Sequence, residues 1–291
     1  MSSEPTVGPL VDAAQIPPWL RGLTGNVDAV AQSVLNRGGD RARWATMFNR
    51  NRRAAAVLVL FAGSWDADPQ RPGGLPSDAE VLLTERAPTL RQHSGQVAFP
   101  GGGADPGDDY PVGTALREAT EETGLDAAGV HVVANLPSFP VPVSSFDVTP
   151  VLGYWREPSE VRVVDEGETA RVARVNVREM LAPENRFQVR RSVLGGRVYQ
   201  GPAFFVDGLL VWGFTGGLIA AISEVAGWDV PWDTDDVRPL DETIERAGSR
   251  QQSGFSAVHP PGTAVSDPAV SDPAVPDSLP SDSSADAGGG R

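Results

Sequence analysis

The 291-residue sequence contains no cysteine. This absence excludes disulfide bonds, zinc sites with thiolate ligands and catalysis by a thiol nucleophile. No serine nucleophile motif replaces the missing thiol. The sequence therefore gives no sign of covalent catalysis through a Ser or Cys side chain, and a hydrolytic activity would have to rely on other groups.

A surplus of positive charge is also missing. The 24 Lys and Arg residues face 38 Asp and Glu residues, which gives a formal net charge of −14 at pH 7. Nucleic-acid binding relies on Lys and Arg to replace the counterions of the phosphates, so we expect no nucleic-acid partner. An anionic small molecule would be repelled at long range, and metal ions and a few local arginines would have to offset that repulsion.

No uninterrupted apolar run is long enough to suggest a membrane span, for which about 20 residues are needed. The segment Ala203–Ile222 approaches this length, but Asp207 and four glycines interrupt it. Its pattern predicts a buried strand followed by a helix that begins at Thr215. The first residues, MSSEPTVGPLVDAAQ, lack a basic region followed by an apolar run, so no secretory signal is visible. We expect a cytoplasmic protein without a membrane partner.

Among the features that are present, the stretch 101–125, GGGADPGDDYPVGTALREATEETGL, stands out. Glu118, Glu121 and Glu122 are three and four positions apart, which places them on one face of an α-helix. Carboxylates this close repel one another, and a divalent cation with oxygen ligands, such as Mg²⁺, is the usual remedy. The three leading glycines let the backbone turn tightly and approach a ligand. Gly124 predicts the end of the helix.

This stretch resembles the signature of the Nudix hydrolase family. With Gly103 as the first residue it follows the family pattern of Gly, five residues, an acid, seven residues and Arg-Glu-aliphatic-x-Glu-Glu-x-Gly-aliphatic. Asp109 then takes the acid position, where the family usually has Glu. Starting from Gly102 instead puts Asp108 at that position, with one extra residue before Arg117. The alternative reading is a solvated acidic helix, which explains neither the glycine loop nor Arg117.

A second pattern lies upstream, with LLTER at 82–86 and LRQHSGQVAFPGG at 90–102. It is similar to the signature Leu-Leu-Thr-x-Arg-Ser-x-x-Leu-Arg-x-His-x-Gly-x-x-x-Phe-Pro-Gly-Gly of the coenzyme A pyrophosphatase branch, with Ala87 at the Ser position. Two later stretches, at 144–153 and 211–215, resemble the same branch, so the resemblance covers residues 52–226. It implies hydrolysis of the diphosphate linkage of coenzyme A, and of acyl forms, to 4′-phosphopantetheine and adenosine 3′,5′-bisphosphate.

The resemblance also implies roles for the residues of the helix. Glu118, Glu122 and Glu121 would be ligands of Mg²⁺ or Mn²⁺, which would neutralise the diphosphate and lower the pKa of a bound water. Glu121, Glu118 and Arg117 would be the catalytic residues, with Arg117 orienting the carboxylates. Glu121 is either a further ligand or the base, because the identity of the base varies within the superfamily.

Outside the helix, Arg86, Arg91 and His93 are candidates for contacts to the substrate. An arginine fork suits phosphate groups, but ion pairs with acidic residues explain the two arginines equally well. His93 is alternatively a structural hydrogen-bonding residue. Glu168 stands where family members often have an acid, as a metal ligand or a base.

The order of apolar runs mixes strands and helices without strict alternation, which favours a mixed sheet between helices. The resemblance implies an α/β/α sandwich. We expect an irregular lead-in over 1–25, a Nudix hydrolase domain over 26–240 with an N-terminal helix, and a low-complexity, acidic, disordered tail over 241–291.

Two alternatives for the function stay open. The substrate could be another nucleoside diphosphate derivative, such as ADP-ribose or NADH, or a nucleoside triphosphate. The domain could also bind a nucleotide without cleaving it, although all three glutamates and Arg117 are present. The sequence leaves the oligomeric state open, a homodimer included.

Overall fold

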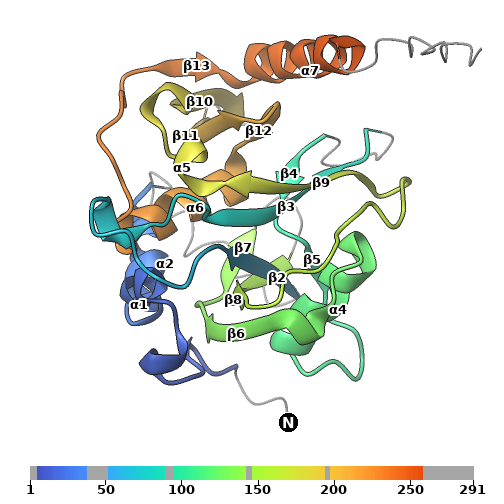
Figure 1. Ribbon diagram of the computed structural model, residues 1–291. Coiled ribbons are helices and arrows are strands. Elements are labelled where there is room, and N and C mark those ends of the chain that lie inside the picture. The colour runs from blue at the N-terminus through green and yellow to red at the C-terminus, as the bar shows by residue number, and fades with distance from the viewer. Residues whose placement is uncertain (1–4, 38–51, 89–94, 142–145, 194–196, 258–291) are drawn as a thin grey trace, which may run out of the picture.

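The computed structural model of the chain describes residues 5–37, 52–88, 95–141, 146–193 and 197–257 (Figure 1). Helices cover both faces of a mixed sheet, and a second, smaller sheet stands beside it. The helices are α1 (Pro18–Thr24), α2 (Val27–Arg37), α4 (Val112–Thr123), α5 (Val177–Met180), α6 (Gly213–Val225) and α7 (Leu240–Ala257). Short 3₁₀ turns lie at Ala13–Gln15, Pro72–Gly74, Ala127–Gly129 and Pro183–Asn185.

The larger sheet, sheet A, follows the order β1-β6-β8-β2-β3-β4, with β5 paired to β2, β7 to β8 and β9 to β3. Its strands are β1 (Gly8–Pro9), β2 (Arg53–Ala62), β3 (Glu80–Arg86), β4 (Val97–Ala98), β5 (Gly101–Gly103), β6 (Val130–Asn135), β7 (Phe139–Val141), β8 (Phe146–Trp155) and β9 (Thr169–Asn176). The central pair β2–β8 is parallel, whereas the other pairs of this sheet are antiparallel.

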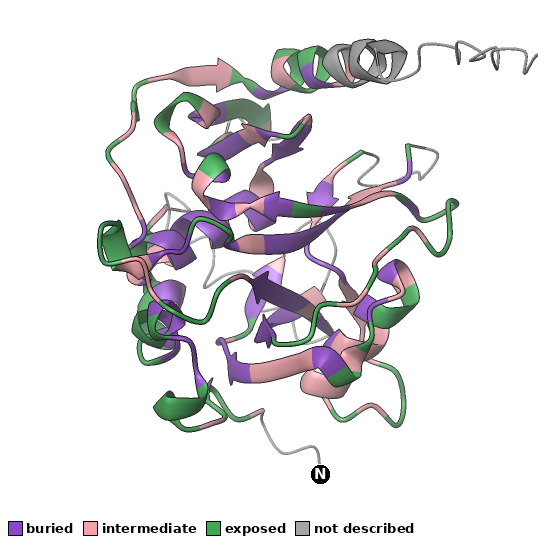
Figure 2. Ribbon diagram, in the orientation of Figure 1, coloured by how far each residue is buried: buried purple, intermediate pink, exposed green. Residues whose placement is uncertain are grey.

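Strand β2 shows why this is a three-layer structure. Its apolar run AAAVLVLFA alternates between the two faces, as the period of a strand requires. Leu58 and Leu60 belong to the core beneath α4, whereas Val59 and Phe61 belong to the core shared with α1, α2 and α6. A strand buried on both faces reads as a continuous apolar run, and Figure 2 shows β2 as buried. The expected α/β/α sandwich with a mixed sheet is confirmed.

Strand β2 also divides its other edge between two partners. Near its start, Ala55–Val57 pair with the glycines of β5, and near its end Phe61 and Ala62 pair with β3. The antiparallel pairing of β2 with β3, the next strand along the chain, therefore extends over only two residue pairs. The long partner of β2 is β8, which is far away in the sequence. This division places β5 and the far end of β3 on the same side of β2.

The smaller sheet, sheet B, follows the order β12-β11-β10-β13. It contains β10 (Arg186–Val193), β11 (Arg197–Val206), β12 (Leu209–Val211) and β13 (Val237–Pro239). One face packs against α7 through a core that includes Phe187, Leu210 and Leu240. The other face joins the larger core through Phe204 and Val206. The expected strand and helix within Ala203–Ile222 are the end of β11, β12 and α6. No helix within the described ranges is long and apolar enough to cross a membrane.

Helices are present in two segments that we expected to be an irregular lead-in and a disordered tail. Residues 1–25 contain α1, because Pro18 occupies the first turn of a helix, where its missing N–H is tolerated. Trp19, Leu20 and Leu23 of α1 are fully buried in the main core. At the other end, α7 extends through residues that we expected to be a disordered tail, and Leu240 anchors it against sheet B. Residues 258–291 of the expected tail lie outside the described residues.

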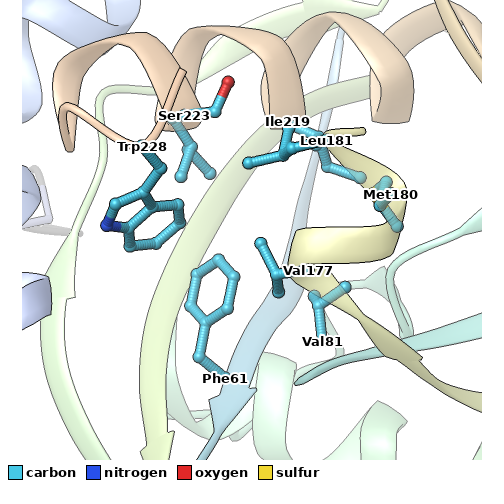
Figure 3. Close-up of a pocket in the computed structure, with 9 residues that line it drawn as sticks. Phe61, Val81, Val177, Met180, Leu181, Ile219, Ser223 and Trp228 are labelled. Atoms are coloured by element: carbon cyan, nitrogen blue, oxygen red, sulfur yellow. The ribbon is translucent and has the colours of Figure 1, made fainter. Parts of the chain in front are cut away.

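The packing between α5, α6 and sheet A leaves a cavity of about 10 Å³, shown in Figure 3. Its walls are apolar apart from Ser223, and they include Phe61, Met180 and Trp228. The Ser223 hydroxyl already donates to Asp229 at 2.7 Å. A buried water needs two to four polar partners, which these walls do not offer. The cavity is therefore a small packing void rather than a ligand site.

Candidate active site

Helix α4 carries the acidic residues, and its position follows from two sequence features. Ala115 and Ala119 are fully buried against β2, and their small side chains let the helix lie close to the sheet. Gly124 ends the helix with φ 68°, and its N–H donates to the carbonyl of Thr120, as expected. With the alanines facing the sheet, Glu118 and Glu122 project beside β5.

The glycines of β5 bring the backbone against these two carboxylates. A Cβ atom on Gly102 would lie only 2.5 Å from the carboxylate of Glu118, so no other residue fits at this position without displacing Glu118. The N–H of Gly101 donates to Oε2 of Glu122 at 3.2 Å. Gly101 itself has φ 156°, a conformation that favours glycine. A Cβ atom on Gly101 would lie 2.4 Å from the carbonyl oxygen of Ala56 in β2, so Gly101 is required by its neighbouring strand and Gly102 by the helix.

Arg117 is surrounded by acceptors. Its guanidinium donates to both oxygens of Asp108, at 3.1 and 3.0 Å, and to the carbonyl of Gly103 at 3.0 Å. It also lies 3.0 Å from Oε1 of Glu118 and 2.9 Å from Oε2 of Glu121. The network settles the position of the acid in the loop: Asp108, rather than Asp109, is the partner of Arg117.

Asp108 is fixed from several directions. Arg117 above all, together with the N–H of Asp105 and the hydroxyl of Thr114, holds the pKa of the Asp108 carboxyl well below its usual range. From the sequence we considered Asp108 only as an alternative to Asp109, and we did not expect a role for Thr114. The sequence feature that could have indicated Thr114 is its position in the first turn of the helix, six residues after Asp108, where its hydroxyl can reach back to the loop.

Glu122 and Glu118 carry poorly compensated charge. Burial raises the pKa of Glu122 from 4.5 to about 7, and the negative charges of Glu118 and Glu168 add to the rise. The N–H of Gly101 and the positive charge of Arg86 only partly oppose it. Burial also raises the pKa of Glu118, against the opposing effect of Arg117. The charges of Glu121 and Asp105 add to the rise at Glu118. Partly buried carboxylates among other negative charges form a site that attracts a cation.

Glu121 is the most exposed of the three glutamates. Its carboxylate lies 2.9 Å from Arg117, one turn earlier on the helix, and its negative charge raises the pKa of Glu118. Within the described parts of the chain, no three Asp, Glu or His side chains are gathered closely enough to hold a metal ion. That Glu121 binds the metal together with Glu118 and Glu122 stays a prediction. Their oxygen donors nevertheless fit a hard divalent cation such as Mg²⁺, which takes one or two carboxylates and fills its other positions with water and substrate phosphates.

Arg86 and Glu168 approach the same place from the β3–β9 edge of sheet A. Both influence the pKa of Glu122, Arg86 by lowering it and Glu168 by raising it. The Nε of Arg86 is buried and has no hydrogen-bond partner in the described structure. The structure therefore brings Arg86 and Glu168 together with the helix glutamates. Arg91 and His93, the other expected substrate contacts, lie outside the described residues.

Comparison with known proteins identifies this arrangement. An uncharacterized Nudix hydrolase of Yersinia pestis, NudL, is 34% identical over 178 residues, which are 60% of this chain and 79% of the relative. The chain belongs to the Nudix hydrolase family. The family model described as NUDIX domain matches residues 52–194, which include β5, α4 and the β3–β9 edge. The NudL of Yersinia pseudotuberculosis matches with the same identity and coverage.

A solved structure of a Nudix hydrolase from M. smegmatis, RenU, is also similar to this chain. The two are 29% identical, and the match covers 44% of this chain and 73% of RenU with a TM-score of 0.33. As a Nudix hydrolase, the protein is an enzyme that acts on nucleoside diphosphate derivatives. Nudix hydrolases generally use divalent metals such as Mg²⁺ or Mn²⁺, and the oxygen donors of Glu118 and Glu122 suit such a cation.

Proposed function

We propose that this Nudix hydrolase cleaves the diphosphate linkage of coenzyme A, with Mg²⁺ or Mn²⁺, to 4′-phosphopantetheine and adenosine 3′,5′-bisphosphate. The observation that carries the proposal is the placement of Arg86. The upstream signature LLTER ends at this residue, its positive charge acts on the partly buried Glu122, and its buried Nε has no hydrogen-bond partner among the described residues. An arginine with such a donor beside the acidic pair is suited to a phosphate oxygen of the substrate.

The residues of the site divide the work between charge and orientation. Glu118 and Glu122 would hold the metal ion, which supplies charge neutralisation for the diphosphate and a water of lowered pKa. Arg117 keeps the Glu118 carboxylate in place through their 3.0 Å contact. Arg86 would bind the substrate phosphate and favour its approach to a strongly acidic protein. Such positioning and charge stabilisation are the main demands of phosphoryl transfer.

Two carboxylates compete for the role of the base that accepts the proton of the attacking water. Glu121 is a ligand or the base by the resemblance, but its Oε2 is already occupied by a hydrogen bond from Arg117 at 2.9 Å. The negative charge of Glu168 acts on Glu122. We infer that Glu168 is the base. A loss of kcat on the order of 10²-fold in Glu168→Gln, with a much smaller loss in Glu121→Gln, would support this inference; the reverse order would assign the base to Glu121.

The proposed substrate is tested by product analysis. The purified full-length protein would be incubated with Mg²⁺ or Mn²⁺ and, in parallel, coenzyme A, acetyl-coenzyme A, ADP-ribose, NADH and a nucleoside triphosphate. We expect adenosine 3′,5′-bisphosphate and phosphopantetheine to appear at the highest rate. Faster cleavage of ADP-ribose or NADH would reject coenzyme A as the substrate. Binding of these compounds without any cleavage would instead indicate a nucleotide-binding module.

A further inference from the structure

A β-bulge lies where strand β9 enters the active site. Along the β3–β9 ladder Glu85 is opposite Arg171, but the next residue, Arg86, is opposite Thr169. Ala170 is therefore an extra residue without a partner. Bulges of this kind redirect the side chains next to them. Here the residues next to the bulge are Arg86 on one strand and, just before the bulge on the other, Glu168, and the charges of both act on Glu122.

Hydrogen bonds hold the backbone around the bulge on the side of β9 that faces β3. The N–H of Ala87 donates to the carbonyl of Glu168 at 2.8 Å, so the two strands stay joined beyond the bulge. The N–H of Arg86 donates to Gln96 on the opposite side of β3. Glu168 itself is exposed, and its preceding loop is closed by hydrogen bonds to Asp165. Nothing in these contacts fixes the outer side of β9 at the bulge.

Sheet B supplies that contact. Arg171, the first residue after the bulge, donates from Nη1 to the carbonyl of Asp207 at 2.8 Å and from Nη2 to the Asp207 carboxylate. Asp207 and Gly208 form the two-residue turn between β11 and β12, with φ 49° and 73°. Two residues with positive φ are typical of the type I′ turn, a stiff connection. The turn is anchored because Val206 and Leu209, on either side of it, are buried in the main core.

We propose that the bidentate contact between Arg171 and Asp207 is a positioning clamp for the active site. It ties the bulged start of β9 to the turn of sheet B and thereby sets the position of Glu168 beside the helix glutamates. Arg171 and Asp207 touch no reacting group, so they are positioning residues. The assignment rests on the proposed function, in which Glu168 and Arg86 take part, and it gives sheet B a role in catalysis.

An effect of the clamp on turnover can be distinguished from an effect on the stability of the fold. The Arg171 and Asp207 side chains are 36% and 58% exposed, and an exposed ion pair contributes little to the free energy of unfolding. Its loss should leave the stability unchanged but let β9 shift. Displacements near 1 Å can reduce turnover strongly when they affect groups at the reacting centre.

Asp207→Asn is the most informative variant. Asparagine tolerates the positive φ at this position, so the turn is kept while the charge is lost. Arg171→Gln removes the other half of the contact. The matched control is Glu242→Gln on α7, which removes the exposed ion pair between Glu242 and Arg246 at 3.5 Å. Each full-length variant would be compared with the unaltered protein for kcat, KM, urea midpoint and hydrogen exchange of residues 165–173.

We expect Asp207→Asn and Arg171→Gln each to lower kcat about tenfold, with a change in KM of less than about twofold and an unchanged urea midpoint. Hydrogen exchange over 165–173 should become several times faster in both, and Glu242→Gln should change none of these quantities. In a Glu168→Gln background, Asp207→Asn should lower kcat much less, because the clamp acts through Glu168.

Two results would overturn the clamp: unchanged exchange over 165–173, or an equal loss of kcat with and without Glu168. If a lower urea midpoint accounted for the lost activity, the contact between Arg171 and Asp207 would be a structural contact without a positioning role. If the unaltered protein cleaved none of the diphosphates, the proposed function would fail. The exchange measurement, which needs no substrate, would still decide whether the contact holds β9.

Discussion

Two arginines border the same pair of partly buried carboxylates, and they come from different regions of the molecule. Arg117 belongs to the loop and helix at 101–124, and its donors are met by Asp108, the carbonyl of Gly103, Glu118 and Glu121. Arg86 belongs to the β3–β9 edge, and its buried Nε has no partner within the described residues.

This difference separates orientation from ligand binding. A guanidinium whose hydrogen bonds are all made within the protein is held in one place and holds its partners in turn. A buried donor without a partner is unfavourable unless something else completes it. The hydrogen bonds of the loop-helix region are thus complete without substrate, whereas under the proposed function a substrate phosphate would complete those of the β3–β9 edge.

The largest effect is expected for Glu122→Gln. The amide keeps the shape and the hydrogen bond from Gly101 but removes the charge that would hold the metal ion. We expect kcat to fall on the order of 10²–10³-fold, as for other lost electrostatic stabilisation at a reacting centre. Steady-state kinetics with Mg²⁺ checks this, with circular dichroism and urea unfolding to verify the fold. Near-normal turnover in a folded variant would remove Glu122 from the metal site.

Arg86→Gln tests whether the β3–β9 edge binds a substrate phosphate. Hydrogen bonds to charged groups contribute about 1.5–3 kcal/mol, so the loss of a phosphate contact should lower kcat/KM by roughly 10- to 100-fold. Arg86→Lys should recover part of this loss, because it keeps the charge but not the forked geometry. Kinetics over a range of substrate concentrations separates KM from kcat. A variant with unchanged kcat/KM would indicate that Arg86 serves only to offset the charge of Glu122.

The sequence predicted the loop and helix at 101–124 better than it predicted the β3–β9 edge. Helix α4, its end at Gly124 and the pair Glu118 and Glu122 follow from local spacing, which the helix geometry converts directly into position. The exposure of Glu121 does not follow, because spacing alone does not say how deeply each carboxylate is buried. The choice between Asp108 and Asp109 depends on the path of a loop, which one residue can change.

At the level of the fold, contacts between distant segments were beyond reach. The buried run of β2 was evident, but its pairing with β8 required knowledge of the sheet. Helix α1 was missed because Pro17 and Pro18 suggest an irregular chain, although a proline suits the first turn of a helix. The contact of Arg171 with Asp207 joins two sheets and leaves no local pattern in the sequence.

Arg117→Gln tests the role of the loop-helix region, and it should lower activity less than Glu122→Gln or Arg86→Gln does. Outer partners of metal ligands typically influence activity by 10- to 100-fold, and we expect about tenfold here, because Glu118 keeps its place beside Gly102. The acid response should change as well. Arg117 depresses the pKa of Asp108, so Asp108 stabilises the fold above its unfolded pKa and this stabilisation is lost as the pH falls. The variant should therefore lose less stability than the unaltered protein between pH 5 and pH 3, as measured by urea unfolding.

The last effect is on stability rather than on turnover, and it concerns the pH dependence of the metal-free protein. The pKa of Glu122 is about 7 in the fold and about 4.5 when unfolded, so the folded state binds the extra proton between these values. Its stabilising effect is complete below about pH 4.5 and is lost as the pH rises through 7, by at most about 3 kcal/mol. Thermal unfolding from pH 5 to pH 8 in the presence of a chelator should show this decline, and Mg²⁺ should reverse it at pH 8.

The comparison of variants makes this measurement specific. Glu122→Gln should remove both the decline and the response to Mg²⁺, since the amide neither titrates nor holds the cation as a carboxylate does. Glu121→Gln should keep both, because Glu121 is exposed and already paired with Arg117. If the stability of the two variants responded alike to pH and to Mg²⁺, Glu121 and Glu122 would contribute equally to the charge of the site. The distinction between the loop-helix region and the β3–β9 edge would then no longer hold.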